Sequence, residues 1–211
     1  MTTARRAATA LAAGTLLLLG GAAAPVPLAL PAVAKGEIQN VKSPVDVTDF
    51  RIGNKNFQVT KMVIQSRPEQ IWHVLTDYDN ACRVFLNLKD CKILEDRGCT
   101  KVVKHRVRPT GLPGTFEYVL EVKETAPRRI EWHRLRGDFR AVDGYWSLDP
   151  LEGGKATLVT YCAHIDGGLF LPAPIVRRQI RVDMPIVMDA LKAEVENKLQ
   201  IARGPEGSRG Q

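Results

Sequence analysis

A stripe of apolar residues near the C-terminus does most to limit what this chain can fold into. After Pro172 and Pro174, apolar side chains recur at steps of three or four residues. They are Val176, Ile180, Met184, Val187, Leu191, Val195 and Leu199. Such spacing is typical of one face of an α-helix, and about 25 helical residues would be ~37 Å long. We expect one long helix, bent at Pro185 and ended at Gly204, that can cross a whole sheet.

The middle of the chain predicts that sheet. Apolar and polar residues alternate from Phe116 to Lys123, which is typical of a strand with one buried face. Segments rich in strand-forming residues predict further strands at 56–65, 90–95, 100–108, 130–133, 145–148 and 156–165. Most connections between them are short, so antiparallel pairing is the simplest topology.

Two short helices are expected after the first predicted strand. Ser66 is the predicted N-cap of the first helix, with Pro68 in the first turn and Glu69 completing the cap. The second helix would be anchored by Val84, Phe85 and Leu88. Both would join the first strand to the rest of the sheet.

The first 34 residues are predicted to be a secretion signal. Arg5 and Arg6 precede an apolar stretch, and the small residues at 32–34 form a pattern that a signal peptidase accepts. The alternative is an uncleaved membrane anchor, but the apolar run is shorter than the ~20 residues that span a bilayer. The protein is therefore expected in the periplasm or a thylakoid lumen, or secreted.

The remaining chain divides by composition. Residues 35–55 are polar and are expected to form an extended lead-in to the first strand. Residues 56–203 would form the folded domain, and 204–211 a disordered tail. No repeat or low-complexity linker divides the predicted domain.

Charge and motifs exclude several classes of function. The 30 Lys and Arg residues exceed the 23 Asp and Glu residues, but they are scattered, so nucleic-acid binding is not expected. No nucleophile elbow, phosphate loop or zinc-protease motif is present. The histidines are dispersed over four predicted elements, at His73, His105, His133 and His164. A base or metal site would require the last three to share the inward face, and we expect neither a metal nor a cofactor.

The cysteines allow two interpretations. In an oxidising compartment they could form two disulfides in any of three pairings. They are Cys82, Cys91, Cys99 and Cys162. A bridge from Cys82 to Cys91 would be the most reachable, since both flank one short loop. The alternative is that several remain buried thiols.

Several segments resemble one known family. They are residues 71–79 (IWHVLTDYD), 85–88 (FLNL), 137–140 with 144–146, and Leu171 with Pro172 before the long helix. In order and spacing they resemble the START-like superfamily, in particular its polyketide cyclase/dehydrase and coenzyme Q-binding branch. The resemblance covers roughly residues 57 to 200. It implies the α+β helix-grip fold: a curved antiparallel sheet of about six to seven strands, two short helices after the first strand, and a long C-terminal helix across the sheet.

The resemblance also implies a binding function. Members of the superfamily enclose lipids, quinones, polyketides or other apolar ligands between the sheet and the helix. The candidate ligand-binding residues are Tyr78, Phe85, Phe116, Tyr118, Leu120, Trp132, Trp146, Ile180, Met184 and Met188. The Tyr78 hydroxyl could form a hydrogen bond with a polar ligand atom. The alternative is that the Tyr78 ring packs in the core.

Two other functions stay open. A cyclase or aromatase could act on a polyketide-like substrate in the same cavity, and it would place titratable groups together there. A protein-interaction module would instead have its interior filled by large side chains. No catalytic set of the family can be transferred to this sequence.

A basic cluster suggests a further partner. Arg177, Arg178 and Arg181 fall at the start of the long helix, near the expected pocket mouth. They form either a solvated face or a surface for anionic lipid head groups. The expected partners are an apolar small molecule and, transiently, a membrane surface, with the protein itself a monomer.

Overall fold

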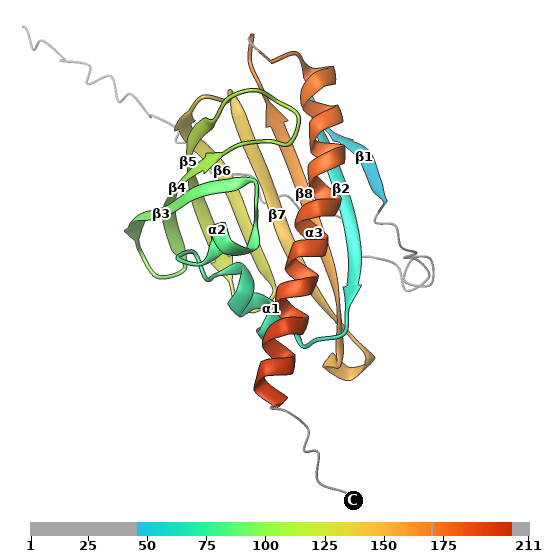
Figure 1. Cartoon of the computed structure of the whole chain (residues 1–211). Helices are drawn as coiled ribbons and strands as arrows, with labels where there is room; N and C mark the ends of the chain where they lie inside the picture. Colours follow the sequence, from blue (N-terminus) through green and yellow to red (C-terminus); the bar gives the residue numbers. More distant parts are fainter. Residues whose placement is uncertain (1–45, 170, 204–211) are drawn as a thin grey trace, which may run out of the picture. The chain divides into compact units, whose positions relative to one another are not determined.

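The computed structural model describes residues 46–169 and 171–203. In this part of the chain an eight-stranded antiparallel sheet has the order β1-β2-β8-β7-β6-β5-β4-β3 (Figure 1). Its strands are β1 (Val47–Ile52), β2 (Lys55–Ile64), β3 (Leu88–Asp96), β4 (Thr100–Val107), β5 (Phe116–Thr125), β6 (Arg129–Gly137), β7 (Ala141–Leu151) and β8 (Ala156–Asp166). The helices are α1 (Pro68–Leu75), α2 (Ala81–Val84) and α3 (Ala173–Arg203), with a 3-10 turn at Glu152–Gly154.

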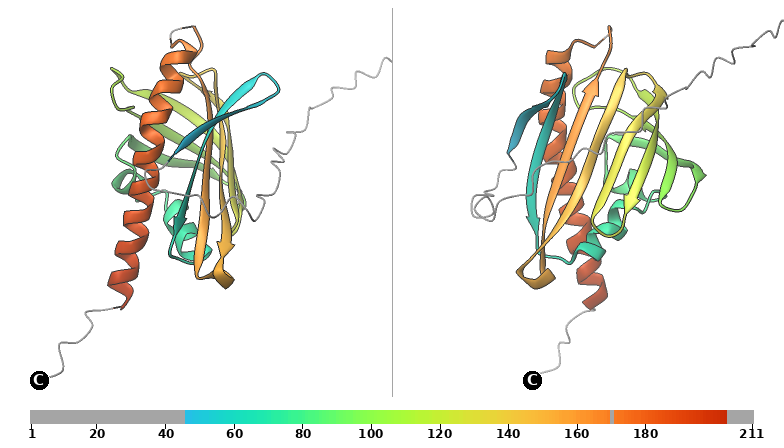
Figure 2. Two further views of the ribbon diagram at one scale, coloured as in Figure 1. Left: turned by 90° about the vertical axis from the view of Figure 1, so that its right-hand side faces the viewer. Right: turned by 180° about the vertical axis from the view of Figure 1, so that it is seen from behind.

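The helices lie on one face of the sheet. They are in front of it in Figure 1 and behind it in the reverse view of Figure 2. This arrangement confirms the predicted helix-grip fold, with eight strands in place of six or seven. No helix among the described residues is long and apolar enough to cross a membrane.

The long helix is anchored by its C-terminal half. Leu191 and Val195 are fully buried in the main core, together with Ile71 of α1 and Leu148 of β7. The helix continues unbroken through Pro185 to Arg203. The apolar stripe in the sequence therefore predicts both the existence of α3 and the face that it buries.

Part of the segment expected to be an extended lead-in, residues 35–55, forms a strand of the sheet. Residues 47–52 form β1, which pairs with β2 through a turn at Gly53, whose φ is +58°. Phe50 stacks on Phe57, with ring centroids 5.5 Å apart. Three of the six residues of β1 are exposed because it is an edge strand, so its apolar pattern is weak. The predicted signal (1–34), the rest of the lead-in (35–45) and the tail (204–211) lie outside the described residues.

The start of α1 differs by one residue from the prediction. Arg67 is the N-cap, and Gln70, not Glu69, completes the cap. The Gln70 Oε1 accepts the Arg67 N–H at 3.3 Å and the Ser66 hydroxyl at 2.8 Å. Ser66 therefore stabilises the start of α1 indirectly, because its hydroxyl holds the Gln70 side chain that completes the cap.

Irregular pairing accompanies the curvature of the sheet. The register shifts once between β5 and β6 and twice between β3 and β4. Such bulges bend a strand and increase its twist. Gly137 lies at the end of β6 with φ +131°, and a Cβ there would be 2.4 Å from the Glu117 carbonyl oxygen. Glycine is therefore required at this position.

Candidate functional site

A cavity of about 260 Å³ lies between the N-terminal half of α3 and the sheet. The residues of α3 that line it are Val176, Gln179, Ile180, Asp183, Met184 and Val187. Strands β3 to β8 form the opposite wall, mostly with apolar and aromatic side chains. Pro109 and Leu112, in the loop between β4 and β5, also line the cavity. The lining thus combines elements that are far apart in the sequence.

The two halves of α3 cover different interiors. Met188 and Leu191 are completely buried and pack in the main core with Ile71 and Trp72 of α1. One turn earlier, Met184 borders the cavity instead. Helix α1 therefore fills the space under the C-terminal half of α3 and leaves the space under the other half to be lined by the loop and the strands.

The structure brings most of the predicted ligand-binding residues together. Those that line the cavity are Tyr78, Phe85, Tyr118, Leu120, Trp132, Trp146, Ile180 and Met184. Two predicted residues do not line it. Met188 is fully buried in the core, and Phe116 stacks on Phe139, with ring centroids 5.0 Å apart. Phe139 lines the cavity in its place.

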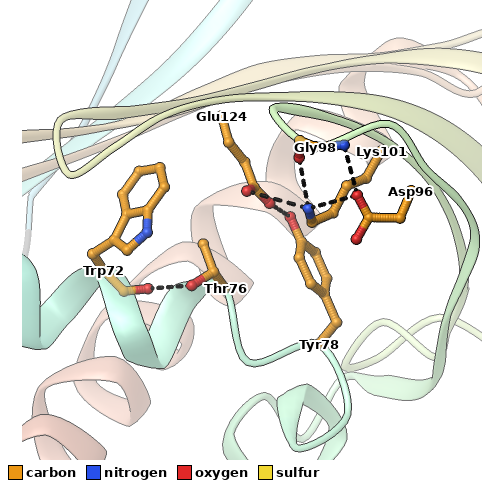
Figure 3. A network of polar contacts seen from close by, with 7 residues as sticks. All are labelled: Trp72, Thr76, Tyr78, Asp96, Gly98, Lys101 and Glu124. Atoms are coloured by element: carbon orange, nitrogen blue, oxygen red, sulfur yellow. Dashed lines mark hydrogen bonds and ion pairs between the residues drawn. The ribbon is translucent and has the colours of Figure 1, made fainter.

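The Tyr78 hydroxyl is already engaged by the protein. It donates a hydrogen bond to Glu124 Oε1 at 2.6 Å, and Lys101 Nζ lies 3.6 Å from the other carboxylate oxygen (Figure 3). Lys101 also contacts Asp96 and the Gly98 carbonyl oxygen. Burial and the bond to Glu124 raise the pKa of Tyr78. Tyr78 thus lines the cavity with its ring, while its hydroxyl ties this segment to β5.

A glycine makes room for one wall of the cavity. Gly144 of β7 pairs with Trp132 of β6, and a Cβ at Gly144 would lie 2.5 Å from the indole ring. The absence of a side chain at Gly144 therefore leaves the space that the indole occupies. Trp146 stacks on Tyr161 at a centroid distance of 4.1 Å, and these rings extend the same wall.

The polar groups on the sheet side of the cavity are neutral. Burial lowers the pKa of His105 to about 4. Burial also raises the pKa of Tyr118 and of Tyr161 above the ordinary value for tyrosine. The His105 and Tyr118 rings meet edge to face at 5.6 Å. At neutral pH this wall offers hydrogen-bonding groups without charge.

The other histidines lie elsewhere. His133 Nε2 is 3.5 Å from the Glu121 carboxylate, and His164 Nδ1 is 2.8 Å from the Asn56 carbonyl oxygen. Neither residue lines the cavity. His105 is therefore the single histidine of the three that faces it, and they do not form a base or metal site together.

All four cysteines are unpaired in this structure, and none of the three possible disulfide pairings is formed in it. Cys91 lines the cavity, and burial raises its pKa to about 12. Cys162 is buried in β8, whereas Cys99 is exposed in the turn after β3. The structure therefore agrees with the second interpretation of the cysteines, in which they remain thiols.

The three arginines lie apart from the cavity. Together with Asp49, Pro174 and Val182 they line a separate shallow depression between α3 and β1. Arg181 donates to the Asp49 carboxylate and, at 3.1 Å, to the Val47 carbonyl oxygen. Arg181 therefore attaches the edge strand to α3, while Arg177 and Arg178 are exposed. None of the three arginines, which were expected near the pocket mouth, is among the residues that line the cavity.

Sequence reasoning missed several lining residues. The missed residues include Tyr161, Val122, Ile130, Val142, Gln179 and Asp183. The strand residues required the register, which alternation alone does not provide. A signal existed for Gln179 and Asp183, because both fall beside the apolar stripe of α3, three residues after Val176 and Ile180. The prediction from the sequence included only the apolar residues of that face.

A curved antiparallel sheet, a long C-terminal helix across it and a cavity between them define the helix-grip class of ligand-binding domains. Residues 64–192 match the model of the family described as polyketide cyclase/dehydrase and lipid transport, and the chain belongs to this family. Among curated proteins, none matches the sequence.

Solved structures share the fold at low sequence identity. The Zhui aromatase/cyclase from Streptomyces is 16% identical, with a TM-score of 0.62 over 70% of this chain and 98% of that one. A START superfamily protein from Mycobacterium smegmatis is 20% identical, with a TM-score of 0.59 over 67% and 98%. The human StAR-related lipid transfer protein 5 is 14% identical, with a TM-score of 0.58 over 78% and 93%. At these identities the likeness concerns the fold alone.

Proposed function

We propose that the protein is an exported carrier that binds one apolar small molecule, such as an isoprenoid, a quinone or quinol, a polyketide or a single-chain lipid. The observation that carries this proposal is the largely apolar cavity between α3 and the sheet. Burial of apolar ligand surface in such a cavity is favourable by about 25 cal/mol per Å². Family membership supports the same conclusion, because the family includes lipid transport.

The cavity volume supports a ligand of modest size. Ligand pockets are commonly ~300–1,000 Å³, and a cavity of ~150 Å³ holds a benzene molecule. About 260 Å³ therefore suits a ring system of two or three rings or one folded chain. A two-chain phospholipid would leave much of its apolar surface outside.

The protonation states favour binding over acid–base catalysis. His105, Tyr118 and Tyr161 stay neutral, and a general base needs a pKa closer to the working pH. Within the described residues, no hydrogen bond joins these groups to one another or to Asp183. The wall is therefore suited to recognising a guest rather than to activating a nucleophile.

The experiment that tests the function is native mass spectrometry of the protein purified from its own host. We expect one added mass per chain, which organic extraction removes and identifies as an apolar small molecule. A variant with a filled cavity, described in the Discussion, is the control for nonspecific adducts. Protein that never carries a guest, although it is folded and its cavity is open, would contradict the proposal.

Contact with an anionic membrane is a further part of the proposal. Arg177 and Arg178 are exposed next to exposed apolar residues, Ile175 and Val182, on α3. Replacing both arginines with glutamine should weaken binding to anionic vesicles about 30-fold in a co-sedimentation assay, at about 1 kcal/mol for each charge. Arg181 is left in place because it holds β1. Unchanged sedimentation at low salt would remove the membrane contact.

A further inference from the structure

Two buried polar atoms of α3 have no hydrogen-bond partner among the residues that the structure describes. They are Gln179 Nε2 and Asp183 Oδ1, and both residues line the cavity. A buried donor or acceptor without a partner is costly, and native structures contain few of them. An unpaired carboxylate oxygen is the more costly of the two. Such atoms beside a cavity indicate groups that a bound molecule satisfies.

The spacing of the two residues places them side by side. Gln179 and Asp183 are four residues apart on α3, so their side chains lie on the same face of the helix. The remaining amide atom, Gln179 Oε1, faces the loop between β4 and β5, since a Cβ at Gly111 would lie 3.6 Å from it. The side-chain amide of Gln179 therefore lies between this loop and the cavity. One guest atom could reach both unpaired groups.

The chemistry of the pair selects one kind of guest atom. The amide Nε2 can only donate a hydrogen bond, while an ionised carboxylate oxygen can only accept one. A hydroxyl group accepts from the first and donates to the second. A ketone or quinone carbonyl satisfies Gln179 alone, and an ammonium group satisfies Asp183 alone. We infer that the carried molecule has a hydroxyl group that bridges Gln179 and Asp183, with its apolar body against the wall formed by β4 to β8.

This inference rests on the proposed carrier function and narrows it. It favours an alcohol, phenol or quinol over the corresponding hydrocarbon, ether or oxidised quinone. Tyr161 lines the same cavity, and Asp183 contributes to the raised pKa of its hydroxyl. The polar end of the guest is therefore expected near α3, and its apolar end near Leu120 and Trp132.

Two fluorescent probes with the same naphthalene ring test the inference. The first is 2-naphthol, and the second is 2-methoxynaphthalene, which keeps the oxygen acceptor but has no donor. The wild-type protein should bind 2-naphthol at least about tenfold more tightly, as expected for a hydrogen bond to a charged group. The preference should disappear in Asp183→Leu, while binding of 2-methoxynaphthalene persists. Asp189→Leu, which removes an exposed carboxylate of the same helix, should keep the preference.

The possible outcomes separate the two proposals. Failure of both probes to bind the wild-type protein would contradict the carrier function itself. Equal binding of both probes to the wild-type protein would overturn the hydroxyl bridge and leave the carrier function intact. Asp183→Asn keeps the shape of the side chain and replaces the leucine variant if that one does not fold. A preference unchanged in the asparagine variant would also overturn the inference.

Discussion

Replacing Ala163 with phenylalanine is expected to weaken binding of an apolar probe by about 70-fold. Ala163 is a small, buried residue of β8 that lines the cavity beside Ile180 and Met184 of α3. A phenyl ring there would displace a guest from roughly 100 Å² of apolar wall, worth about 2.5 kcal/mol at about 25 cal/mol per Å². Fluorescence titration with the neutral probe N-phenyl-1-naphthylamine measures the change.

The matched control adds the same ring outside the cavity. Ala202 is exposed in the last turn of α3, so Ala202→Phe should bind the probe like the wild-type protein. Val122→Phe fills the cavity from β5 and checks the result if Ala163→Phe unfolds. Thermal unfolding of each variant shows whether the fold is kept. Undiminished binding in both folded, cavity-filled variants would show that the probe binds elsewhere.

Acid is expected to destabilise the protein through His105. Its pKa of about 4 in the folded protein is below the ordinary value of about 6.5 in the unfolded chain. Above pH 6.5 the ring is neutral in both states and has no effect. Between pH 6.5 and 4 the unfolded chain binds a proton that the folded protein does not bind. The free energy of unfolding then falls by about 1.4 kcal/mol for each pH unit, to a total of at most about 3 kcal/mol.

Comparison with two variants isolates this contribution. In His105→Gln the stability lost between pH 6.5 and 4 should be smaller than in the wild-type protein by most of that amount. His133→Gln changes a histidine on the solvent side of β6 and should keep the wild-type dependence. Urea denaturation at several pH values gives the free energies. Parallel curves for His105→Gln and the wild-type protein would mean that His105 is not held neutral by the cavity.

The fold was predictable because each of its main elements has a strong local pattern. The stripe from Val176 to Leu199 identifies α3, and the alternation around Tyr118 identifies an inward face. The edge strand β1 was not predicted, because an exposed strand has little apolar alternation. Residues with a strong pattern were therefore predicted correctly, and exposed ones were missed.

The cavity was only partly predictable, because its limits depend on packing between distant segments. Met184 and Met188 fall on the same stripe of α3, yet one borders the cavity and the other is enclosed by the core around α1. Nothing in the sequence near either methionine shows where α1 will lie. Likewise, Phe116 was predicted to line the cavity, but Phe139, on which its ring stacks, lines it instead.

The polar residues of the site were missed for a different reason. Gln179 and Asp183 are polar, so a prediction of cavity-lining residues that relies on apolar side chains does not include them. Their significance appears only when the structure shows that one polar atom of each is buried beside the cavity, without a partner among the described residues. A polar residue next to an apolar helical stripe is the pattern that would have identified them.

The central claim is that an apolar guest occupies the space between α3 and the sheet. The most direct test is NMR of protein with labelled methyl groups, with N-phenyl-1-naphthylamine bound. We expect intermolecular NOEs from the probe to the methyl groups of Ile180, Met184 and Val122, and none to the exposed Ile201. NOEs confined to Ile201 or other surface methyl groups would contradict the account.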